Sequence, residues 1–294
     1  MNKNFTSAIK EITSLLKEEN TRVFNHRTLV NVLKLKREVW GKYLKELPVE
    51  TLVTRLIEEK VVEKIRLAHE SYQKEFIRYL FNNPSVYEVA LSLKSGSYLS
   101  HGTAVFLHGL NNQLPKTVYT NKEQSKKPAS SGKLSQESIN RAFSNKQRES
   151  QFLISFGGHD IVLLSGKNTG KLHVTELKPD GYPLQVTSIE RTLVDIAVRP
   201  NYAGGTSQVL EAYKGAIGRV SVNAIQAILK KLGYTYPYHQ VVGFYLAKAG
   251  YPPEQVAWLK ERFPIEFDFF LEYAIPEIAR EYSQEWRLFY PKGL

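Results

Sequence analysis

The sequence contains no cysteine. This absence excludes a disulfide framework, a thiolate zinc site and a cysteine nucleophile, and it suits a reducing compartment. Long apolar runs are also missing, since none approaches the roughly 20 residues that a membrane-spanning helix needs. The N-terminal segment MNKNFTSAIKEITSLLKEEN has the periodicity of an amphipathic helix and not the pattern of a signal peptide. We therefore expect a cytoplasmic protein that has no membrane partner.

Acidic residues are scarce relative to basic ones, and the formal net charge is +11. Residues 1–80 hold 16 Lys and Arg against 11 Asp and Glu, and residues 111–150 hold 8 against 3. Nearly all of the basic excess therefore lies in these two segments. Such an excess favours a polyanionic partner, because neutralising phosphates releases their counterions. Many basic proteins bind no nucleic acid, so charge alone leaves both interpretations open.

The hydrophobic pattern predicts an α+β fold with two domains. Helices are expected at 5–18, 26–34 and 48–60, followed by strands at 61–68 and 75–81. Three helices followed by a two-stranded ribbon is the order of a winged helix-turn-helix, which we place at residues 1–82. The segment KLKREVWGKYLKELPVE is ambiguous in this pattern, because it is long and charged for a helix-turn-helix linker.

A mixed domain is expected over residues 83–294, with a small sheet and a mostly helical end. The segment SVYEVALSL and the short segment after Ser100 are predicted helices, the second ending at Gly109. A further short helix begins after Ser135, and the strands comprise KTVYTN, two runs within QFLISFGGHDIVLLSG, and KLHVTELK. Helices are then predicted at 188–198, 206–217, 222–231, 238–248 and 253–262.

The stretch TSIERTLVDIAVRP, residues 187–200, places charges within an apolar run. Thr187 and Glu190 have the spacing of a capping box at a helix start. Arg191 and Asp195 are separated by one helical turn, so they are expected to pair on one face. Pro200 prevents the helix from continuing. We favour a structural role for these charges over a catalytic one.

The same stretch, followed by YAGG, resembles the signature of the AbiEi antitoxin family of type IV toxin–antitoxin systems. SYLSHGTAVFLHGL resembles a second segment of that family. The resemblance continues through TNKEQSKKP, LSQESINRAF, YPYHQVVGFYLAKAGY and WRLFYPKGL, and it covers roughly residues 85–294. The predicted winged helix-turn-helix is similar to the DNA-binding domain of the family.

The resemblance implies an antitoxin that is also a DNA-binding transcriptional autorepressor, binding inverted repeats in its own promoter. The implied opponent is a nucleotidyltransferase-like toxin, which the antitoxin counteracts without a stable complex. Antitoxin activity is associated with the C-terminal domain. The implied protein is not an enzyme and uses no cofactor.

Within residues 1–82, the helix at 48–60 is expected to read the DNA groove because it directly precedes the ribbon. Its outward residues suit base edges or phosphates, and the ribbon cations suit backbone phosphates. The predicted DNA-binding residues are Arg27, Thr51, Thr54, Arg55, Lys64, Arg66, Lys74 and Arg78. The simpler interpretation is that each exposed Lys or Arg is only a solvated surface charge.

Enzyme motifs are weak by comparison. No P-loop, dinucleotide fingerprint or nucleophile elbow occurs. His101 and His108 lack a third ligand by spacing, and His239 is expected to pack among aromatic residues, so no metal site is predicted. One alternative is a metal-dependent nuclease in which Asp160, Glu176 and Lys178 meet on adjacent strands. Another is a non-enzymatic adaptor that binds protein partners.

Overall fold

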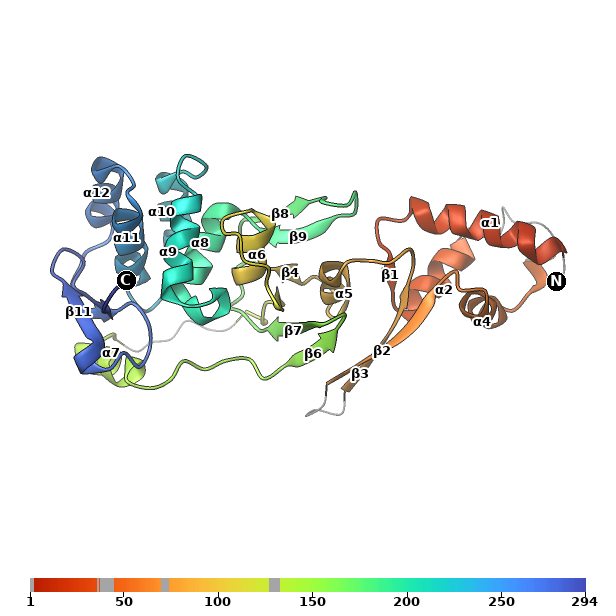
Figure 1. The fold of residues 1–294 in the computed structure, drawn as a ribbon, viewed down its shortest axis with the longest axis horizontal. Coiled ribbons are helices and arrows are strands. Elements are labelled where there is room, and N and C mark those ends of the chain that lie inside the picture. The colour runs from red at the N-terminus through yellow and green to blue at the C-terminus, as the bar shows by residue number, and fades with distance from the viewer. Residues whose placement is uncertain (1–2, 36, 38–44, 70–73, 127–132) are drawn as a thin grey trace. The chain divides into compact units, whose positions relative to one another are not determined.

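The computed structural model describes residues 3–35, 37, 45–69, 74–126 and 133–294, and its fold is α+β (Figure 1). The chain divides into two compact units. Unit 1 comprises Met1–Ser97, Phe152–Ile161 and Glu176–Leu184, and unit 2 comprises Tyr98–Gln151, Val162–Thr175 and Gln185–Leu294. Unit 1 thus gathers an N-terminal segment with two short later segments of the chain.

Unit 1 contains the predicted helices and hairpin strands, and also the strand β1, which the sequence pattern did not predict. The elements are α1 (Lys3–Glu18), β1 (Val23–Phe24), α2 (His26–Leu35), α4 (Val49–Glu58), β2 (Glu63–His69), β3 (Lys74–Leu80), α5 (Val86–Ser92) and β6 (Leu153–Phe156). The first three strands form an antiparallel sheet in the order β1-β3-β2. Residues 36 and 38–44 of the ambiguous segment lie outside the described residues.

Amphipathic periodicity explains how the unit 1 helices pack. Their apolar stripes meet in one core, whose most completely buried members include Ile12, Leu16, Leu29, Leu33, Leu52 and Leu56. Tyr79 and Phe81 join this core from β3 and the residue that follows it. Burial of such side chains stabilises the fold by roughly 1.5–3 kcal/mol each. Figure 1 shows the β2–β3 hairpin projecting away from α1, α2 and α4.

The register of the β2–β3 hairpin separates its side chains into two faces. Lys64 lies opposite Tyr79 and Arg66 opposite Ile77, so these four residues share one face. The other face carries the pairs Ile65–Arg78, Leu67–Phe76 and His69–Lys74. On that second face, the rings of His69 and Phe76 contact Phe152 next to β6, with ring centroids 4.6 and 6.2 Å away.

Unit 2 is mostly helical after residue 188. Its complete elements are β4 (Tyr98–Leu99), α6 (His101–Leu107), β5 (Thr117–Asn121), α7 (Gln136–Phe143), α8 (Ile189–Val198), α9 (Thr206–Gly215), α10 (Val222–Leu232), α11 (Tyr238–Ala249), α12 (Pro253–Arg262), β10 (Phe269–Phe270), β11 (Arg280–Ser283) and β12 (Leu288–Pro291). The last three strands form a small sheet in the order β10-β12-β11. The predicted helices of this half are confirmed with shifts of one or two residues at their ends.

A six-stranded sheet has the order β6-β7-β5-β4-β9-β8. Its remaining strands are β7 (His159–Leu164), β8 (Val174–Leu177) and β9 (Leu184–Thr187). The sequence pattern predicted β7 and β8 but missed β4 and β9. These two pair in parallel through Leu99 and Val186. Strand β4 has only two residues, too few for an alternation to be recognised.

Helix α8 lies at the centre of unit 2. All of its residues from Arg191 to Val198 are buried, and it contacts α6, α9, α10 and α11. The largest fully buried side chain, Trp286, fits against Gly243 of α11 so closely that a Cβ at residue 243 would lie 2.1 Å from the indole ring. In the described part of the chain, the helices are too short or too polar to cross a membrane.

Candidate nucleic-acid interface

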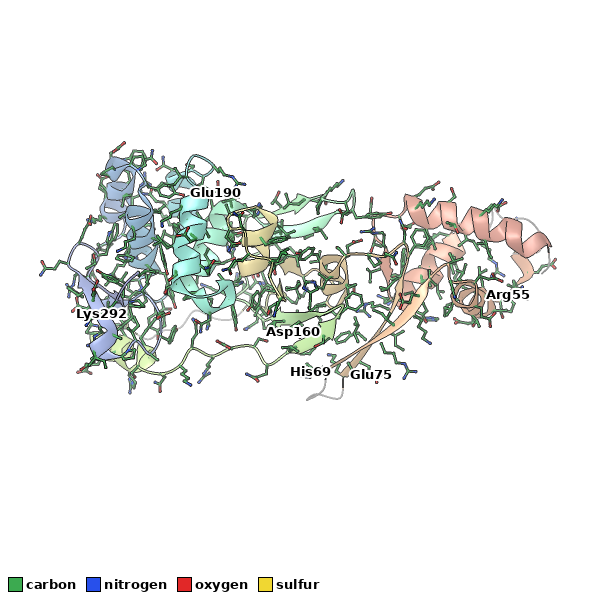
Figure 2. All side chains as sticks on the ribbon, in the orientation of Figure 1. Arg55, His69, Glu75, Asp160, Glu190 and Lys292 are labelled. Atoms are coloured by element: carbon green, nitrogen blue, oxygen red, sulfur yellow. The ribbon has the colours of Figure 1, made fainter. Side chains whose placement is uncertain are left out.

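Helix α4 presents a short polar face to solvent. Leu52, Val53 and Leu56 point into the core, which leaves Thr51 and Thr54 exposed and Arg55 half-buried. The Thr54 hydroxyl donates to the backbone oxygen of Glu50 at 3.0 Å and keeps a lone pair available as an acceptor. Figure 2 shows Arg55 on this helix. The exposed face of α4 also carries Glu50 and Glu58, so it is not a cationic surface by itself.

Helix α2 supplies a different kind of surface. Its sequence, HRTLVNVLKL, contains no acidic residue, and His26, Arg27, Thr28, Asn31 and Lys34 are exposed. The backbone of its first turn is fixed by Asn25 and Thr28, since the Asn25 side chain accepts from the Thr28 amide at 2.9 Å. The sequence prediction selected only Arg27 from this helix. The lack of acidic residues is the signal that would have extended the choice to Asn31 and Lys34.

His26 on α2 contacts both α4 and the β2–β3 hairpin. Its Nδ1 lies 3.3 Å from the Tyr79 hydroxyl on β3, and its Nε2 lies 3.2 Å from Oε1 of Glu50 on α4. Tyr79 is directly opposite Lys64 on the same face of the hairpin. His26 therefore links the start of α2 to the start of α4 and to Tyr79, the cross-strand neighbour of the β2 cation Lys64.

The four predicted ribbon cations do not lie together. Lys64 and Arg66 are exposed on the face that continues toward His26, whereas Lys74 and Arg78 are on the opposite face. The expectation that Arg78 is a solvent-exposed ribbon cation is wrong, because only 7% of this residue is exposed. Strand alternation dictates this split.

Arg78 is held by neighbours within unit 1. Its Nε donates to Ser92 Oγ at 3.0 Å, and its other nitrogens donate to the backbone oxygens of Ser92 and Ile77. Its guanidinium also lies 5.5 Å from the centre of the Phe76 ring. Burial lowers the pKa of Arg78 below its ordinary value. These contacts fasten the hairpin to α5 and leave the side chain unsuited to a phosphate.

Arg22 and Glu88 form a second buried link to α5. Arg22 Nε donates to Glu88 Oε1 at 2.9 Å, and a second guanidinium nitrogen contacts Oε2. The same carboxylate accepts from the backbone N–H of Ser85 at 2.8 Å and so completes the capping box of α5. Bidentate pairing of this kind has strict geometry. Residues beyond 82 are therefore needed to satisfy the charge of Arg22.

The charged stretch at 187–200 is the buried helix α8. Arg191 Nε donates to Asp195 Oδ1 at 2.7 Å, and both side chains are buried. The pairing predicted from their spacing is confirmed. The predicted capping residue is wrong by one position, because Ser188 accepts from the Arg191 amide at 3.3 Å. The Thr187 hydroxyl instead contacts that of Thr192 inside the unit, at 2.8 Å.

A polar network fixes the loop at residues 169–172, whose last carbonyl is hydrogen-bonded to Arg191. The Leu172 carbonyl accepts from Arg191 Nη1 at 3.1 Å. Glu123 fixes the preceding turn, since its carboxylate accepts from the backbone amides of Thr169 and Lys171 at 2.9 and 3.2 Å. Burial raises the pKa of Glu123, but these hydrogen bonds outweigh it and hold the pKa below its ordinary value. The buried Arg191–Asp195 pair therefore has protein partners on both sides, as expected of an ion pair with a structural role.

The histidines do not converge. His101 Nδ1 lies 2.8 Å from the Ser100 hydroxyl, and its ring packs edge-on against Tyr202. His108 Nε2 contacts the Thr187 backbone oxygen at 2.7 Å, and His239 stacks on Phe263. Across the described residues, no group of three or more His, Asp, Glu or Cys side chains is placed to hold a metal ion.

The nuclease alternative required adjacent strands, and that requirement is not met. Asp160 lies on β7 and Glu176 on β8, and the strands β5, β4 and β9 separate them in the sheet. Asp160 accepts from the Ser155 hydroxyl at 2.9 Å, as the β6–β7 hairpin brings them together. Lys178 pairs with Glu176 at 3.3 Å on an exposed surface. Both local contacts account for these charges without a shared metal.

One solved structure provides a comparison across nearly the whole chain. The crystal structure of the RV2827C protein from Mycobacterium tuberculosis matches with a TM-score of 0.57 and 14% sequence identity. The match covers 97% of this chain and 91% of that one. No family model matches the sequence, and no curated protein is significantly similar to it. The structural likeness shows a shared fold and leaves the activity of the chain to be inferred from its surfaces.

Proposed function

We propose that the chain is a DNA-binding transcriptional autorepressor and antitoxin of a type IV toxin–antitoxin operon. The order α1, β1, α2, α4, β2, β3 supports the proposal of a winged helix-turn-helix in which α4 would serve as the recognition helix. The DNA-binding part of the proposal rests on the contacts of His26. This residue links α2 to Glu50 of α4 and to Tyr79, which lies opposite Lys64 of β2, and we take the surface around these contacts as the DNA-binding face. The antitoxin part rests on the resemblance of residues 85–294 to the AbiEi family.

The side chains of this face suggest which elements contact phosphates and which contact bases. Arg27, Lys64 and Arg66 are exposed cations suited to phosphate oxygens. The hydroxyls of Thr51 and Thr54 suit base edges, and a carboxylate such as that of Glu50 accepts from the amino group of cytosine. Acidic side chains on a recognition helix repel phosphates, so the cations of α2 and β2 supply the electrostatic attraction. The proposed ligand is duplex DNA that carries inverted repeats from the promoter of the operon encoding this chain.

Lys64 and Lys74 provide a matched pair for testing this arrangement. Both are exposed lysines of one hairpin, but they lie on opposite faces. We expect Lys64→Ala to weaken binding of the promoter duplex and to reduce the slope of log affinity against log salt by about one. Lys74→Ala is expected to change both quantities much less. Fluorescence anisotropy titrations over a range of salt concentrations measure them, and equal losses in the two variants would contradict the assigned face.

Arg55 tests the role of α4 separately. Arg55→Ala is expected to weaken binding to the promoter duplex more than binding to a scrambled duplex, because α4 is proposed to read bases. Lys64→Ala should weaken both duplexes alike, since a phosphate contact carries no sequence information. Competition titrations with the two duplexes distinguish these effects. The assignment of α4 fails if Arg55→Ala lowers both affinities by the same factor.

The antitoxin role has its own test. We expect co-expression of this chain with the nucleotidyltransferase-like toxin of the proposed operon to restore growth, and purification of the two together to yield no stable complex. Variants of the DNA-binding face should still restore growth when both proteins are expressed from an unrelated promoter. A failure of the full chain to restore growth would remove the antitoxin role while leaving the DNA-binding proposal intact.

A further inference from the structure

A half-open hollow of about 590 Å³ lies between helices α10 and α12 of unit 2. Its lining comes from one face of α10 and the end of α12, and consists of Asn223, Gln226, Ala227, Lys230, Arg262 and Phe263. The α10 residues recur at the three- and four-residue spacing of a single helical face. A hollow of this size is in the range of pockets that enclose a small organic molecule.

The lining is cationic and contains no carboxylate. Lys230 and Arg262 contribute two positive charges, and α10 has no Asp or Glu along its whole length. The acid-free stretch is longer than the helix, since residues 212–253 contain five Lys or Arg and neither Asp nor Glu. Two cations that line one hollow repel each other. An anion placed between them relieves that repulsion.

Lys230 is not needed to cap its own helix. The last carbonyls of α10, those of Leu232 and Gly233, accept from Lys167 Nζ at 2.7 and 3.2 Å. This lysine comes from a distant loop of unit 2 and neutralises the negative end of the helix dipole. The Lys230 charge therefore remains available to whatever occupies the hollow.

Gln226 is the most informative residue of the lining. Only 4% of it is exposed, and its Nε2 has no hydrogen-bond partner among the described residues. A buried amide donor without a partner destabilises a fold, so such groups are uncommon. A turn of this side chain toward the hollow would let Nε2 donate to an acceptor there. Asn223, one turn earlier on α10, offers a second amide.

Phe263 gives the hollow an aromatic wall. It follows α12 directly, and its ring is nearly parallel to that of His239, with an interplanar angle of 16° and a centroid separation of 5.2 Å. His239 is itself fixed by a contact from Nε2 to the Pro264 backbone oxygen at 3.2 Å. The ring is therefore held in place beside the two cations. A fixed aromatic ring beside positive charge suits a planar base attached to phosphate.

We propose that this hollow binds a nucleotide. Lys230 and Arg262 take the phosphates, the amides of Gln226 and Asn223 bond to the polar edge of the base or ribose, and Phe263 packs against the base. Arg262 can engage a phosphate through two nitrogens at once, whereas Lys230 acts as a point charge. The proposal is independent of DNA binding, because all of these residues belong to unit 2.

The test uses the full chain and isothermal titration calorimetry with ATP, GTP, CTP and UTP in turn. Adenosine and inorganic triphosphate serve as partial ligands. For the nucleotide that binds best, we expect Lys230→Ala and Arg262→Ala each to weaken affinity about tenfold or more. Lys231→Ala is the matched control, since it removes the same charge from the exposed position next to Lys230 and should leave the affinity nearly unchanged.

Gln226→Met separates a binding role from a purely structural one. Removing the unpaired buried donor should raise the melting temperature of the ligand-free protein. If the amide also serves a ligand, the same variant should bind the nucleotide less tightly. A raised melting temperature with unchanged nucleotide affinity would show that Gln226 has no part in binding.

Three outcomes would overturn the proposal as a whole. The first is that none of the four nucleotides binds. The second is that binding survives both Lys230→Ala and Arg262→Ala, which would place the ligand on another basic surface. The third is that inorganic triphosphate binds as tightly as the nucleotides, which would show a simple anion site with no recognition of the base.

Discussion

Arg191 donates from Nε to Oδ1 of Asp195 at 2.7 Å, one turn along a helix that is buried on every side. Burial raises the pKa of Asp195, and the neighbouring guanidinium opposes this effect. Taking two charges out of water is costly, so the pair fixes the position of α8 more than it adds stability. The cost becomes visible only when one partner is removed.

Asp195→Ala is expected to destabilise the protein by about 3–5 kcal/mol, because it leaves Arg191 charged and buried without its carboxylate. The double variant Arg191→Met with Asp195→Leu should recover part of that loss. Glu211→Ala, which breaks the exposed pair with Lys214, is the control and should cost under about 1 kcal/mol. Urea denaturation measures all three. A folded, fully stable Asp195→Ala protein that fails the proposed growth-restoration test, where the unsubstituted chain passes it, would identify α8 as a functional site.

His101 predicts a specific response of stability to acid. Burial, with Arg191 and Arg199 nearby, lowers the pKa of His101 to about 3. Above pH of about 6.5 the ring is neutral in both states and has no linkage effect. Below it the unfolded chain binds a proton that the folded chain does not. The free energy of unfolding therefore falls as the pH drops from about 6.5 toward 3, at a limiting slope of about 1.4 kcal/mol per pH unit.

His101→Asn should remove this contribution, so the slope of the free energy of unfolding against pH should fall by about 1.4 kcal/mol per pH unit near pH 5, the equivalent of one proton. Asparagine is chosen because residue 101 has a φ of 51°, a conformation that Asn tolerates better than most residues. The free energy of unfolding of both proteins, measured from pH 7.5 to 4.5, gives the two slopes. If the variant and the parent lose stability in parallel over this range, His101 does not bind its proton selectively in the unfolded chain.

Gly243 has no room for a side chain. A Cβ there would lie 2.1–2.2 Å from two ring carbons of the fully buried Trp286, far inside contact distance. Gly243→Ala is therefore expected to destabilise unit 2 by about 1–3 kcal/mol or more, because the tightly packed side chains around Trp286 cannot move aside without strain. Adding Trp286→Phe should recover part of the lost stability by shortening the ring. Thermal melts of the single and double variants test this, and no recovery would show that the clash lies elsewhere.

The extent of the N-terminal fragment can be tested by truncation. A fragment of residues 1–82 lacks Glu88 and Ser92, so it leaves Arg22 and Arg78 without the partners that bury them. A fragment of residues 1–97 keeps both. We expect the longer fragment to unfold more cooperatively and at a higher temperature by circular dichroism. Glu88→Ala in the longer fragment should remove much of that advantage, and equal stability of both fragments would argue against a role for α5.

Local sequence determined most of the helices and the hairpin. The apolar stripe of α4 and the alternation of β2 appear in the sequence because each depends only on residues within a few positions. The Arg191–Asp195 pair was accessible for the same reason, since both residues lie on one turn of one helix. The cap of α8 was missed by one residue because Thr187 and Ser188 both suit that position, and only packing against Thr192 places Thr187 inside.

Tertiary structure decided which of these local features meet. Alternation alone puts Arg78 and Lys64 on different faces, but contacts with Ser92, which comes from another part of the chain, bury Arg78 while Lys64 stays exposed. The predicted adjacency of Asp160 and Glu176 failed because strand order depends on pairing between distant segments. The lining of the hollow between α10 and α12 likewise had no sequence signature. The sequence by itself therefore determined the elements and their polar faces, which depend on the periods of helix and strand. Contacts between distant segments determined which charges are buried. A charged side chain is buried only when residues from elsewhere in the chain pack against it, and the local sequence pattern does not specify those residues.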